Sequence, residues 1–480
     1  QVKMESSGRS YNVAVVGGGI SGLSAAYYLS RYLAGSEFSL ELFEARPRFG
    51  GVIETVTMDG CLMEGGPDSI FTAKDDALTL IRDLGLQSKI VETDSERRRS
   101  LIATGGQLHP LPPGFVMLAP SEILPFASTE LLSTKGKLRT LMDLFIGPRF
   151  YGDEESVSRF IERRFGREIL EKIVQPMVGG IYVGDVDKLS AECTIPQFVE
   201  LERTNGSVIA GLIGRRSKNL SGNGVSGARY GMFVSLQGGI GALVDALVES
   251  TRSSDVALHT DSQVEAIGQT ETGWTLTVKG RLQKEFDSIL LCLPSHDLVE
   301  LTRDLDSDLT EALVEIPCAS SIVVNLLYER NQSDYDFDAF GFVVPATEDT
   351  SIIAGSFSSV KYKVRCPEDK LMLRAFLGGV LDEEILSCSD EEIFARSHRD
   401  LARFLNIKGE PVSAWLRRWT HSMPQYQLGH RERVRRILSS LENFPGLYLA
   451  GNSYSGVGIP DCIASARTSA AKMSAYMKAR

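Results

Sequence analysis

The pattern of hydrophobic and polar positions is clearest near the start of the chain. Apolar β-formers from Val13 to Val16 run into three consecutive glycines, Gly17 to Gly19, and then into an Ala- and Leu-rich segment that reaches Leu29. A second segment of strand-forming residues extends from Phe38 to Glu44. This pattern predicts a strand, a tight turn, a helix and a second strand.

In the middle of the chain the spacing of the apolar residues changes. From about residue 75 to residue 207, apolar residues recur at intervals of three and four, most clearly over 160–178, which predicts helices. The Gly- and Ser-rich stretch 215–231 predicts a loop. A helix is then expected after residue 240, followed by strands at 256–259, 263–267, 274–278 and 288–294.

The last third of the chain predicts a region of mixed structure and then a return to the first pattern. Strands are expected at 322–328, 340–345 and 370–377, with a helix over 391–404. The apolar segment 447–452 predicts a strand that passes through a glycine turn into a helix beginning near Pro460. A second strand-turn-helix unit therefore closes the chain.

The first glycine turn has the residues that a dinucleotide requires. Gly17 permits the turn, Gly19 lets the backbone approach a pyrophosphate, Gly22 allows close packing, and the helix N-terminus offers free N–H groups. The GxGxxG pattern is weak alone in a chain with 45 glycines, but Glu44 lies 22 residues after Gly22, near the spacing expected of a ribose-binding carboxylate. The alternative for Glu44 is a solvated acid at a strand end. An intact ribose favours FAD or NAD over NADP.

Further glycine-rich segments fit the same ligand. Gly50 and Gly51 follow the second strand, and 64–69 reads EGGPDS, so both segments are expected to be loops that line a nucleotide. Near the C-terminus, Gly458 precedes a helix with Pro460 at its start. The positive end of that helix suits an electron-rich group, which in a flavoenzyme is the N1/O2 edge of the reduced flavin.

Composition excludes several classes of function. With 480 residues, 43% hydrophobic residues and a net charge of −11, the chain is expected to be globular and not to have nucleic acid as its main partner. It contains no run of 18 apolar residues. Seven scattered cysteines and six dispersed histidines predict reduced thiols and no protein-bound metal. No targeting signal is visible, so we expect a cytoplasmic protein.

Several motifs resemble one family. Residues 44–51 match the ExxxRxGG pattern of FAD-dependent amine oxidases and related flavoproteins. GPDS at 66–69, QPMVGGIYVGDVDKLS at 175–190, MPQYQLGH at 423–430 and GVGIPDCI at 456–463 are similar to the porphyrinogen oxidases, above all the soluble bacterial branch that acts on coproporphyrinogen III or protoporphyrinogen IX. The resemblance implies a six-electron oxidation of a porphyrinogen through FAD, with O2 reduced to hydrogen peroxide.

The resemblance also implies a fold and its domains. We expect an α/β fold with a discontinuous Rossmann-like FAD-binding domain, a mixed-sheet substrate domain and a helical domain. The three parts of the FAD-binding domain are 11–85, 229–307 and 436–480; the helical domain, as a substrate cap or a membrane-associated part, is 86–228, and the substrate domain is 308–435.

Positions that match the family's motifs give an expected FAD site. Asn452 stands where many relatives carry an acid, and its amide can still bind a ribityl hydroxyl. Val264 is expected to meet the adenine through its backbone. The full expected set is Gly17, Gly19, Ile20, Ser21, Gly22, Glu44, Arg48, Gly50, Gly51, Val52, Gly66, Val264, Trp419, Gly451, Asn452, Val457, Gly458 and Ile459.

The expected substrate contacts follow from the propionates that porphyrinogens carry. Arg99 occupies the place of a carboxylate-binding arginine, although three consecutive arginines also describe a solvated turn. Lys74 and the basic residues of 361–365 are further candidates. Tyr362 and Val343 are expected to form apolar walls, and Gly180, next to Gly179, to let the macrocycle approach the main chain. No catalytic acid or base is expected, because the flavin carries the chemistry.

Alternatives remain at this point. An amine oxidase shares the ExxxRxGG motif but has a Glu-Gly pair where this chain has Val457-Gly458. A non-catalytic binding module of the same fold is the alternative from another class. The proline-broken apolar segment 108–146 predicts either a cap over the site, buried interdomain packing or peripheral contact with the inner face of the cell membrane. The oligomeric state is not predicted.

Overall fold

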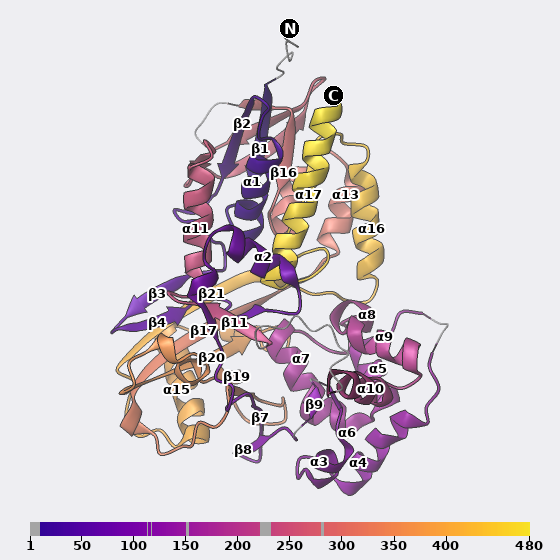
Figure 1. Ribbon diagram of the computed structural model, residues 1–480, viewed down its shortest axis with the longest axis vertical. Helices are drawn as coiled ribbons and strands as arrows, with labels where there is room; N and C mark the ends of the chain where they lie inside the picture. The colour runs from indigo at the N-terminus through magenta and orange to yellow at the C-terminus, as the bar shows by residue number, and fades with distance from the viewer. Residues whose placement is uncertain (1–9, 113, 117, 150–152, 221–231, 280–282) are drawn as a thin grey trace.

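The computed structural model describes residues 10–112, 114–116, 118–149, 153–220, 232–279 and 283–480. A parallel sheet with its helices occupies the upper part of the molecule in Figure 1, a mixed sheet lies below it to the left, and a helical lobe lies to the lower right. The C-terminus lies at the end of the parallel sheet that is farthest from the two lower parts (Figure 1).

Three separate stretches of the chain build the parallel sheet. In the described part of the chain its order is β12 (Ala257–His259), β2 (Phe38–Phe43), β1 (Tyr11–Val16), β16 (Ser288–Leu291) and β22 (Leu447–Leu449), all parallel. Val13 to Val16 of β1 and all of β16 are buried, which explains why these segments read as continuous apolar runs. The expected discontinuous α/β fold is therefore confirmed.

Helices and a small sheet cover the parallel sheet. One hydrophobic core joins it to α1 (Ile20–Tyr32), α2 (Asp75–Asp83), α11 (Gly241–Arg252) and α17 (Ile459–Ala479). A second core joins it to β13 (Val264–Gln269), β14 (Trp274–Val278), β15 (Lys284–Phe286), α12 (Ser295–Thr302), α13 (Ser307–Val314) and α16 (His430–Leu441). Helix α17 begins at Ile459, as the sequence predicts.

The mixed sheet has seven strands in the described residues. Its order is β21 (Ser413–Pro424), β17 (Cys318–Glu329), β20 (Lys370–Gly378), β19 (Ile352–Ser356), β18 (Gly341–Val343), β7 (Ser100–Thr104) and β8 (Gln107–Pro110). Only the β18–β7 pair among these is parallel. Helices α14 (Ser358–Lys361) and α15 (Asp390–Leu405) and the short turns η4 (Arg330–Gln332), η5 (Lys363–Arg365) and η6 (Glu384–Ser387) complete this part.

The expectation of helices from residue 75 to residue 207 is wrong for 90–120. This stretch forms β6 (Ile90–Glu92), β7, β8, β9 (Phe115–Val116) and β10 (Ala119–Pro120), and β6 pairs with β11 (Phe233–Leu236), which also pairs with β5 (Ile70–Phe71). Strands β3 (Thr55–Met58) and β4 (Cys61–Glu64) form a hairpin. The turn η1 (Gln87–Lys89) precedes β6.

The helical lobe has its own hydrophobic core. Its elements are α3 (Ile123–Ser128), α4 (Thr134–Leu141), η2 (Met142–Leu144), α5 (Val157–Arg164), α6 (Arg167–Ile169), η3 (Leu170–Val174), α7 (Gln175–Tyr182), α8 (Ala191–Thr194), α9 (Pro196–Asn205) and α10 (Val208–Leu220). Residues 160–178 are helical as expected, with a break at Gly166, whose φ of 94° follows the end of α5. Helix α10 continues to Leu220, so the loop expected from residue 215 is wrong up to that point, and 221–231 lies outside the described residues.

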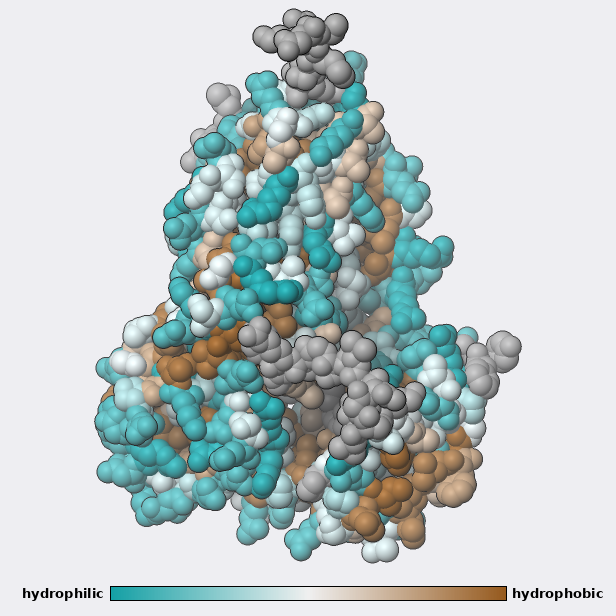
Figure 2. Space-filling view, in the orientation of Figure 1, coloured by the Kyte–Doolittle hydropathy of each residue, from teal (hydrophilic) through white to brown (hydrophobic). Residues whose placement is uncertain are grey.

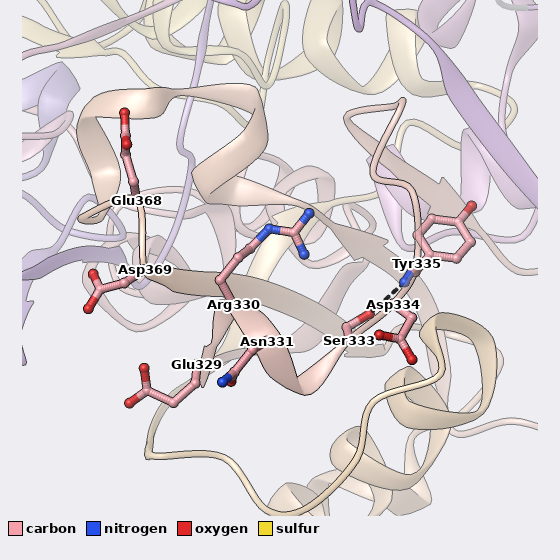
Figure 3. A pocket seen from close by; sticks show the side chains of 8 residues that line it. All are labelled: Glu329, Arg330, Asn331, Ser333, Asp334, Tyr335, Glu368 and Asp369. Carbon is pink, nitrogen blue, oxygen red and sulfur yellow. Dashed lines mark hydrogen bonds between the residues drawn. The ribbon is translucent and has the colours of Figure 1, made fainter.

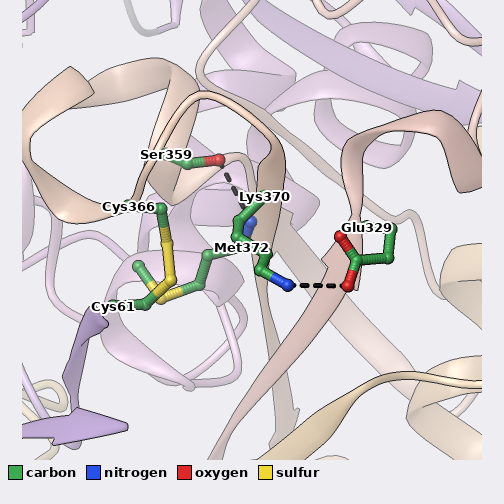
Figure 4. The surroundings of a disulfide bond; sticks show 6 residues. All are labelled: Cys61, Glu329, Ser359, Cys366, Lys370 and Met372. Carbon is green, nitrogen blue, oxygen red and sulfur yellow. Dashed lines mark hydrogen bonds and ion pairs between the residues drawn. A yellow bond between two sulfur atoms is a disulfide. The ribbon is translucent and has the colours of Figure 1, made fainter. Parts of the chain in front are cut away.

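Two further findings concern the chain as a whole. Cys61 and Cys366 form a disulfide between β4 and the segment just before β20, so the expectation that all cysteines are reduced is wrong for this pair (Figure 4). The pairing joins residues 305 positions apart, which no spacing rule could reveal. Among the described residues, no helix has both the length and the apolar character needed to cross a membrane.

Candidate cofactor and substrate site

The first glycine turn joins β1 to α1, and its glycines have different physical roles. A Cβ on Gly17, whose φ is 101°, would lie 2.6 Å from the carbonyl oxygen of Cys292, and one on Gly22 would lie 1.7 Å from the oxygen of Gly17. These two positions need glycine for the protein's own packing. A Cβ on Gly19 would meet nothing nearer than the Cα of Gly51, at 3.8 Å. The protein leaves space there, as a bound pyrophosphate requires.

Glu44 is buried beside this turn. One of its carboxylate oxygens accepts the backbone N–H of Gly18 at 2.6 Å, and the other accepts that of Arg46 at 2.8 Å. Each oxygen has a second lone pair, which leaves the carboxylate able to accept ribose hydroxyls as well. Its backbone oxygen accepts the N–H of Ser262, so the start of β13, with Val264, lies near the expected adenosine end of the site.

Arg48 is hydrogen-bonded to the second glycine loop, which contains Gly50 and Gly51. Its guanidinium donates to the carbonyls of Gly51 at 2.7 Å and Ile53 at 3.0 Å and to the carboxylate of Glu54 at 3.1 Å. Burial lowers the pKa of Arg48. The loop is joined to the first turn because the N–H of Gly50 donates to the oxygen of Gly18 at 2.8 Å.

A third loop, Glu64 to Ser69, lies against the second. A Cβ on Gly66 would come within 2.0 Å of the carbonyl oxygen of Val52, so only glycine fits. The indole N–H of Trp419 on β21 donates to the oxygen of Gly65 at 2.6 Å. The structure therefore brings together the predicted residues Val52, Gly66 and Trp419, which come from the two ends of the chain.

The C-terminal part of the predicted site surrounds the start of α17. Gly451 has a φ of 141°, and the side-chain amide of Asn452 donates to the oxygen of Ser422 at 3.3 Å. The hydroxyl of Tyr426 donates to the backbone oxygen of Asn452 at 2.5 Å and accepts the N–H of Gly456 at 2.8 Å. These bonds fix the turn that carries Val457 and Gly458, and Gly458 is the N-cap of α17.

The predicted substrate residues fall into two groups, of which the first meets across an interface. Helix α7 packs on β18 and β19, and a Cβ on Gly180 would lie 3.4 Å from Cγ1 of Val343 and 3.9 Å from Cβ of Ala354. The structure thus brings Gly180 and Val343 together. Figure 1 shows α7 on the side of the helical lobe that is next to the mixed sheet.

The polar groups of the second group, Arg99, Lys74 and Tyr362, already bind other side chains of the protein. Arg99 is exposed and forms an ion pair with Asp338 at 2.6 Å, and Lys74 pairs with Asp461 in the first turn of α17. Tyr362 is fully buried, and its hydroxyl donates to Ser69 Oγ at 2.9 Å. Burial raises the pKa of Tyr362. Arg99 and Lys74 would each have to exchange a protein carboxylate for a ligand carboxylate.

Sequence reasoning missed the apolar row that continues from Val343. Across the paired strands, Val343 lies beside Ala354, Ala354 beside Phe376, and Phe376 beside Val323. Cross-strand neighbours point to the same face, so these four side chains form one wall next to α7. Phe376 is half-buried, unlike its neighbours along β20. A flat apolar ligand could therefore lie against this wall.

A buried ionic network lies between this wall and the third loop. Arg365 pairs with Glu64 at 2.6 Å, while Lys361 at 3.1 Å and Arg374 at 3.3 Å pair with Asp68. Although burial opposes ionisation, the positive charges of Lys361 and Arg374 lower the pKa of Asp68. The network holds three cations against two anions.

Other candidate sites lack the chemistry of this region. A surface cavity of about 620 Å³ lies where η4 follows β17 and is lined by Glu329, Arg330, Asn331, Ser333, Asp334, Tyr335, Glu368 and Asp369 (Figure 3). Its four carboxylates oppose an anionic ligand, and it contains no predicted site residue. In the described part of the chain, no cluster of three or more His, Cys, Asp or Glu side chains is arranged to hold a metal ion.

Comparisons with known proteins agree with this geometry. Residues 20–474 match the model of the family described as flavin containing amine oxidoreductase. The chain is 34% identical to the coproporphyrinogen III oxidase of Bacillus subtilis, covering 94% of this chain and 95% of the relative. It is 32% identical to the coproporphyrinogen III oxidase of Staphylococcus aureus, covering 97% and 99%.

Solved structures share the fold. A crystal structure from Exiguobacterium sp. 255-15, of a candidate protoporphyrinogen oxidase, has a TM-score of 0.85 and 30% identity and covers 97% of this chain and 99% of its own. A putrescine oxidase variant has a TM-score of 0.69 at 19% identity, which shows the fold alone. The expected cofactor follows from the family, and the glycine turns fit it: the chain belongs to the flavin-containing amine oxidoreductases and uses FAD.

Proposed function

We propose that this protein oxidises coproporphyrinogen III to coproporphyrin III in haem biosynthesis, with FAD as cofactor and O2 as electron acceptor. The observation that carries the proposal is the match, at 32–34% identity over nearly the full length, to three bacterial relatives named coproporphyrinogen III oxidase. Plant relatives named protoporphyrinogen oxidase match at 26–30%. Protoporphyrinogen IX is therefore the second candidate substrate.

The residues of this chain would bind and orient, and the cofactor would supply the redox chemistry. FAD would supply the redox chemistry when bound, which is hydride transfer from a porphyrinogen and reduction of O2 to hydrogen peroxide. Gly17, Gly19 and Gly22 provide the pyrophosphate turn, and Glu44 provides the ribose carboxylate. The start of α17, at Gly458, would offer a helix N-terminus with its partial positive charge to the flavin.

The substrate would lie against the apolar wall that faces α7. Val343, Phe376 and Val323 supply flat apolar surface, and Gly180 removes a side chain from the opposite side. Arg99 immediately precedes β7, whose Ile102 pairs with Val343, so Arg99 lies at the start of the strand next to the wall. We propose that Arg99 exchanges Asp338 for a substrate propionate, because charge-assisted bonds between guanidinium and carboxylate are strong and directional.

Initial rates on two substrates test the proposal. Purified FAD-loaded protein is mixed with coproporphyrinogen III or protoporphyrinogen IX, and porphyrin fluorescence and peroxide are followed together. We expect a higher kcat/KM for coproporphyrinogen III and three peroxides per porphyrin, since six electrons leave in pairs. A higher value for protoporphyrinogen IX would reverse the preference, and activity on amines alone would replace the proposal by an amine oxidase. Refolded protein that binds no FAD would favour the non-catalytic module.

An exposed apolar surface supports a second proposal, peripheral contact with the inner face of the cell membrane. On the helical lobe, Leu124 is 84% exposed, Leu138 63%, Met142 51% and Phe145 88%. Figure 2 shows apolar residues gathered on this lobe, at the lower right. The segment 131–142 that carries much of this surface contains two lysines and an arginine but no acid, in a chain of net charge −11. Exposed apolar side chains together with nearby cations suit an anionic bilayer.

Vesicle sedimentation tests this contact. We expect binding to vesicles that contain phosphatidylglycerol, weaker binding to pure phosphatidylcholine, and loss of binding in Phe145→Asp. Leu381→Asp is the matched control, because Leu381 is 60% exposed but lies in the mixed-sheet part. Equal binding by Phe145→Asp and the unchanged protein would refute the proposal.

A further inference from the structure

The third loop of the site is held by its carbonyl groups. Asn325 Nδ2 donates to the oxygen of Glu64 at 3.0 Å and Trp419 Nε1 to that of Gly65 at 2.6 Å. Arg374 donates to the oxygen of Gly66 at 2.5 Å and Arg365 to that of Asp68 at 3.2 Å. The residue between them, Pro67, has no N–H group to donate. Four of five consecutive carbonyls thus have a side-chain donor, and we call these four donors the carbonyl clamp.

Three donors of the carbonyl clamp lie on the mixed sheet and the fourth, Arg365, lies in η5, whereas the loop belongs to the N-terminal part of the chain. Asn325 on β17 and Arg374 on β20 are directly paired in register, and Trp419 lies on β21, the other neighbour of β17. Asn325, Arg374 and Arg365 are each at most 2% exposed, and Trp419 is 7% exposed. Because buried donors and acceptors are costly to leave unpaired, the loop cannot move without the sheet.

Close contacts on two sides restrict the position of the loop backbone. A Cβ on Gly65 would lie 2.8 Å from the ring of Trp415, and one on Gly66 would lie 2.0 Å from the oxygen of Val52. The backbone therefore passes between the sheet and the second glycine loop. The N–H of Gly65 is also bound within the protein, because it donates to the oxygen of Glu54 at 2.7 Å.

We propose that Asn325, Arg374 and Trp419 are positioning residues, which hold the loop from Gly65 to Pro67 in the geometry that FAD requires. The inference rests on the proposed function only for the FAD site itself. It also links substrate and cofactor, since Val323 and Phe376 of the apolar wall lie two residues before Asn325 and two residues after Arg374 on the same strands. A ligand bound to the wall would contact the strands whose side chains hold the third loop.

Charge supports the same assignment. Among the described residues of the network, Glu64 and Asp68 are the carboxylates that pair with Lys361, Arg365 and Arg374. Buried charges are stable only when they are paired and hydrogen-bonded. The loop carbonyls of Gly66 and Asp68, which accept from Arg374 and Arg365, therefore complete the partners of these two guanidinium groups.

Two tryptophans provide a matched test. Trp419→Phe removes one N–H that binds the oxygen of Gly65, and Trp274→Phe removes one N–H that binds the oxygen of Pro445, in another part of the fold. We expect similar falls in the melting temperature of the two apoproteins. The FAD dissociation constant, measured by quenching of FAD fluorescence, should rise about tenfold in Trp419→Phe, the effect of one net hydrogen bond, and stay unchanged in Trp274→Phe.

Arg374 and Asn325 provide a second, independent test. Arg374→Met and Asn325→Leu should weaken FAD binding at least as much as Trp419→Phe, and Arg374→Lys should restore part of the affinity because it keeps a donor. If Arg374→Met does not fold, the tryptophan pair decides. Unchanged FAD affinity in Trp419→Phe, or an equal loss in Trp274→Phe, would overturn the proposal. No porphyrinogen is used, so a protein that binds FAD but oxidises no porphyrinogen refutes the proposed function and leaves this inference standing.

Discussion

Alanine substitutions at two glycines of the first turn can separate the effect on stability from the effect on cofactor binding, because each adds a single methyl group. Gly19 has φ −71° and ψ −176°, angles that alanine adopts readily, and its Cβ would meet no protein atom within 3.8 Å. Alanine is a poorer N-cap than glycine but reduces the entropy of the unfolded chain. These effects oppose each other, so the free energy of unfolding of Gly19→Ala apoprotein should change by less than about 1 kcal/mol.

The same methyl group would occupy the space left for a pyrophosphate. We expect the FAD dissociation constant of Gly19→Ala to rise at least about 100-fold, equivalent to about 3 kcal/mol. Gly22→Ala is the contrasting variant, because its Cβ would lie 1.7 Å from the oxygen of Gly17. The backbone must shift to relieve this overlap, which should lower the free energy of unfolding by about 3 kcal/mol or more.

The assays are urea unfolding of both apoproteins and titration with FAD. If Gly19→Ala binds FAD as tightly as the unchanged protein, the turn is not the pyrophosphate site. If Gly19→Ala is destabilised as strongly as Gly22→Ala, the space beside Gly19 belongs to the protein and not to a ligand. Either result refutes the different roles assigned to the two glycines.

Three other changes have defined outcomes. Arg164 and Asp143 form a fully buried ion pair at 2.6 Å, so Arg164→Met should lower the free energy of unfolding, measured in urea, by about 3–5 kcal/mol, and equal stability would contradict the pairing argument. Burial lowers the pKa of His430 to about 4 from its usual 6.5, so the unfolded chain binds a proton that the native state does not. The free energy of unfolding should therefore rise with pH across this interval by roughly 3 kcal/mol, and His430→Gln should remove that part of the pH dependence. Arg99→Ala should raise KM for the better porphyrinogen severalfold while FAD affinity is unchanged, and an unchanged KM would remove Arg99 from the substrate site.

Local signals made much of the fold predictable. Strand β1, the glycine turn and the start of α17 at Ile459 depend on neighbouring residues, and each was expected where the structure has it. The β7–β8 hairpin also had a local signal that was missed. Gly105 and Gly106, with φ of 60° and 76°, separate two short strands, and two consecutive glycines between such strands are typical of a hairpin.

Register could not be predicted in the same way. The run LMLRAFLG at 371–378 shows no alternation, because side chains on both faces of β20 are mostly buried, so the sequence does not tell which residues share a face. Only the pairing of β20 with β17 and β19 places Phe376 in the wall with Val343 and Arg374 beside Asn325. The wall and the carbonyl clamp both result from contacts distant in sequence, and so does the disulfide of Cys61 and Cys366.

The motif residues also show why a sequence pattern cannot assign a role by itself. Arg48 was expected at the cofactor, yet its guanidinium donates to the carbonyls of Gly51 and Ile53 and to Glu54. Glu44 was expected to bind the ribose, yet its carboxylate also accepts two backbone N–H groups of the neighbouring loops. A glycine loop that approaches a phosphate has no side chains to hold its own backbone, so charged residues next to it must do so. The charged residues of the ExxxRxGG pattern therefore stabilise the loops as well as binding the ligand. These two contributions can be separated only by measuring stability and FAD affinity on the same variants.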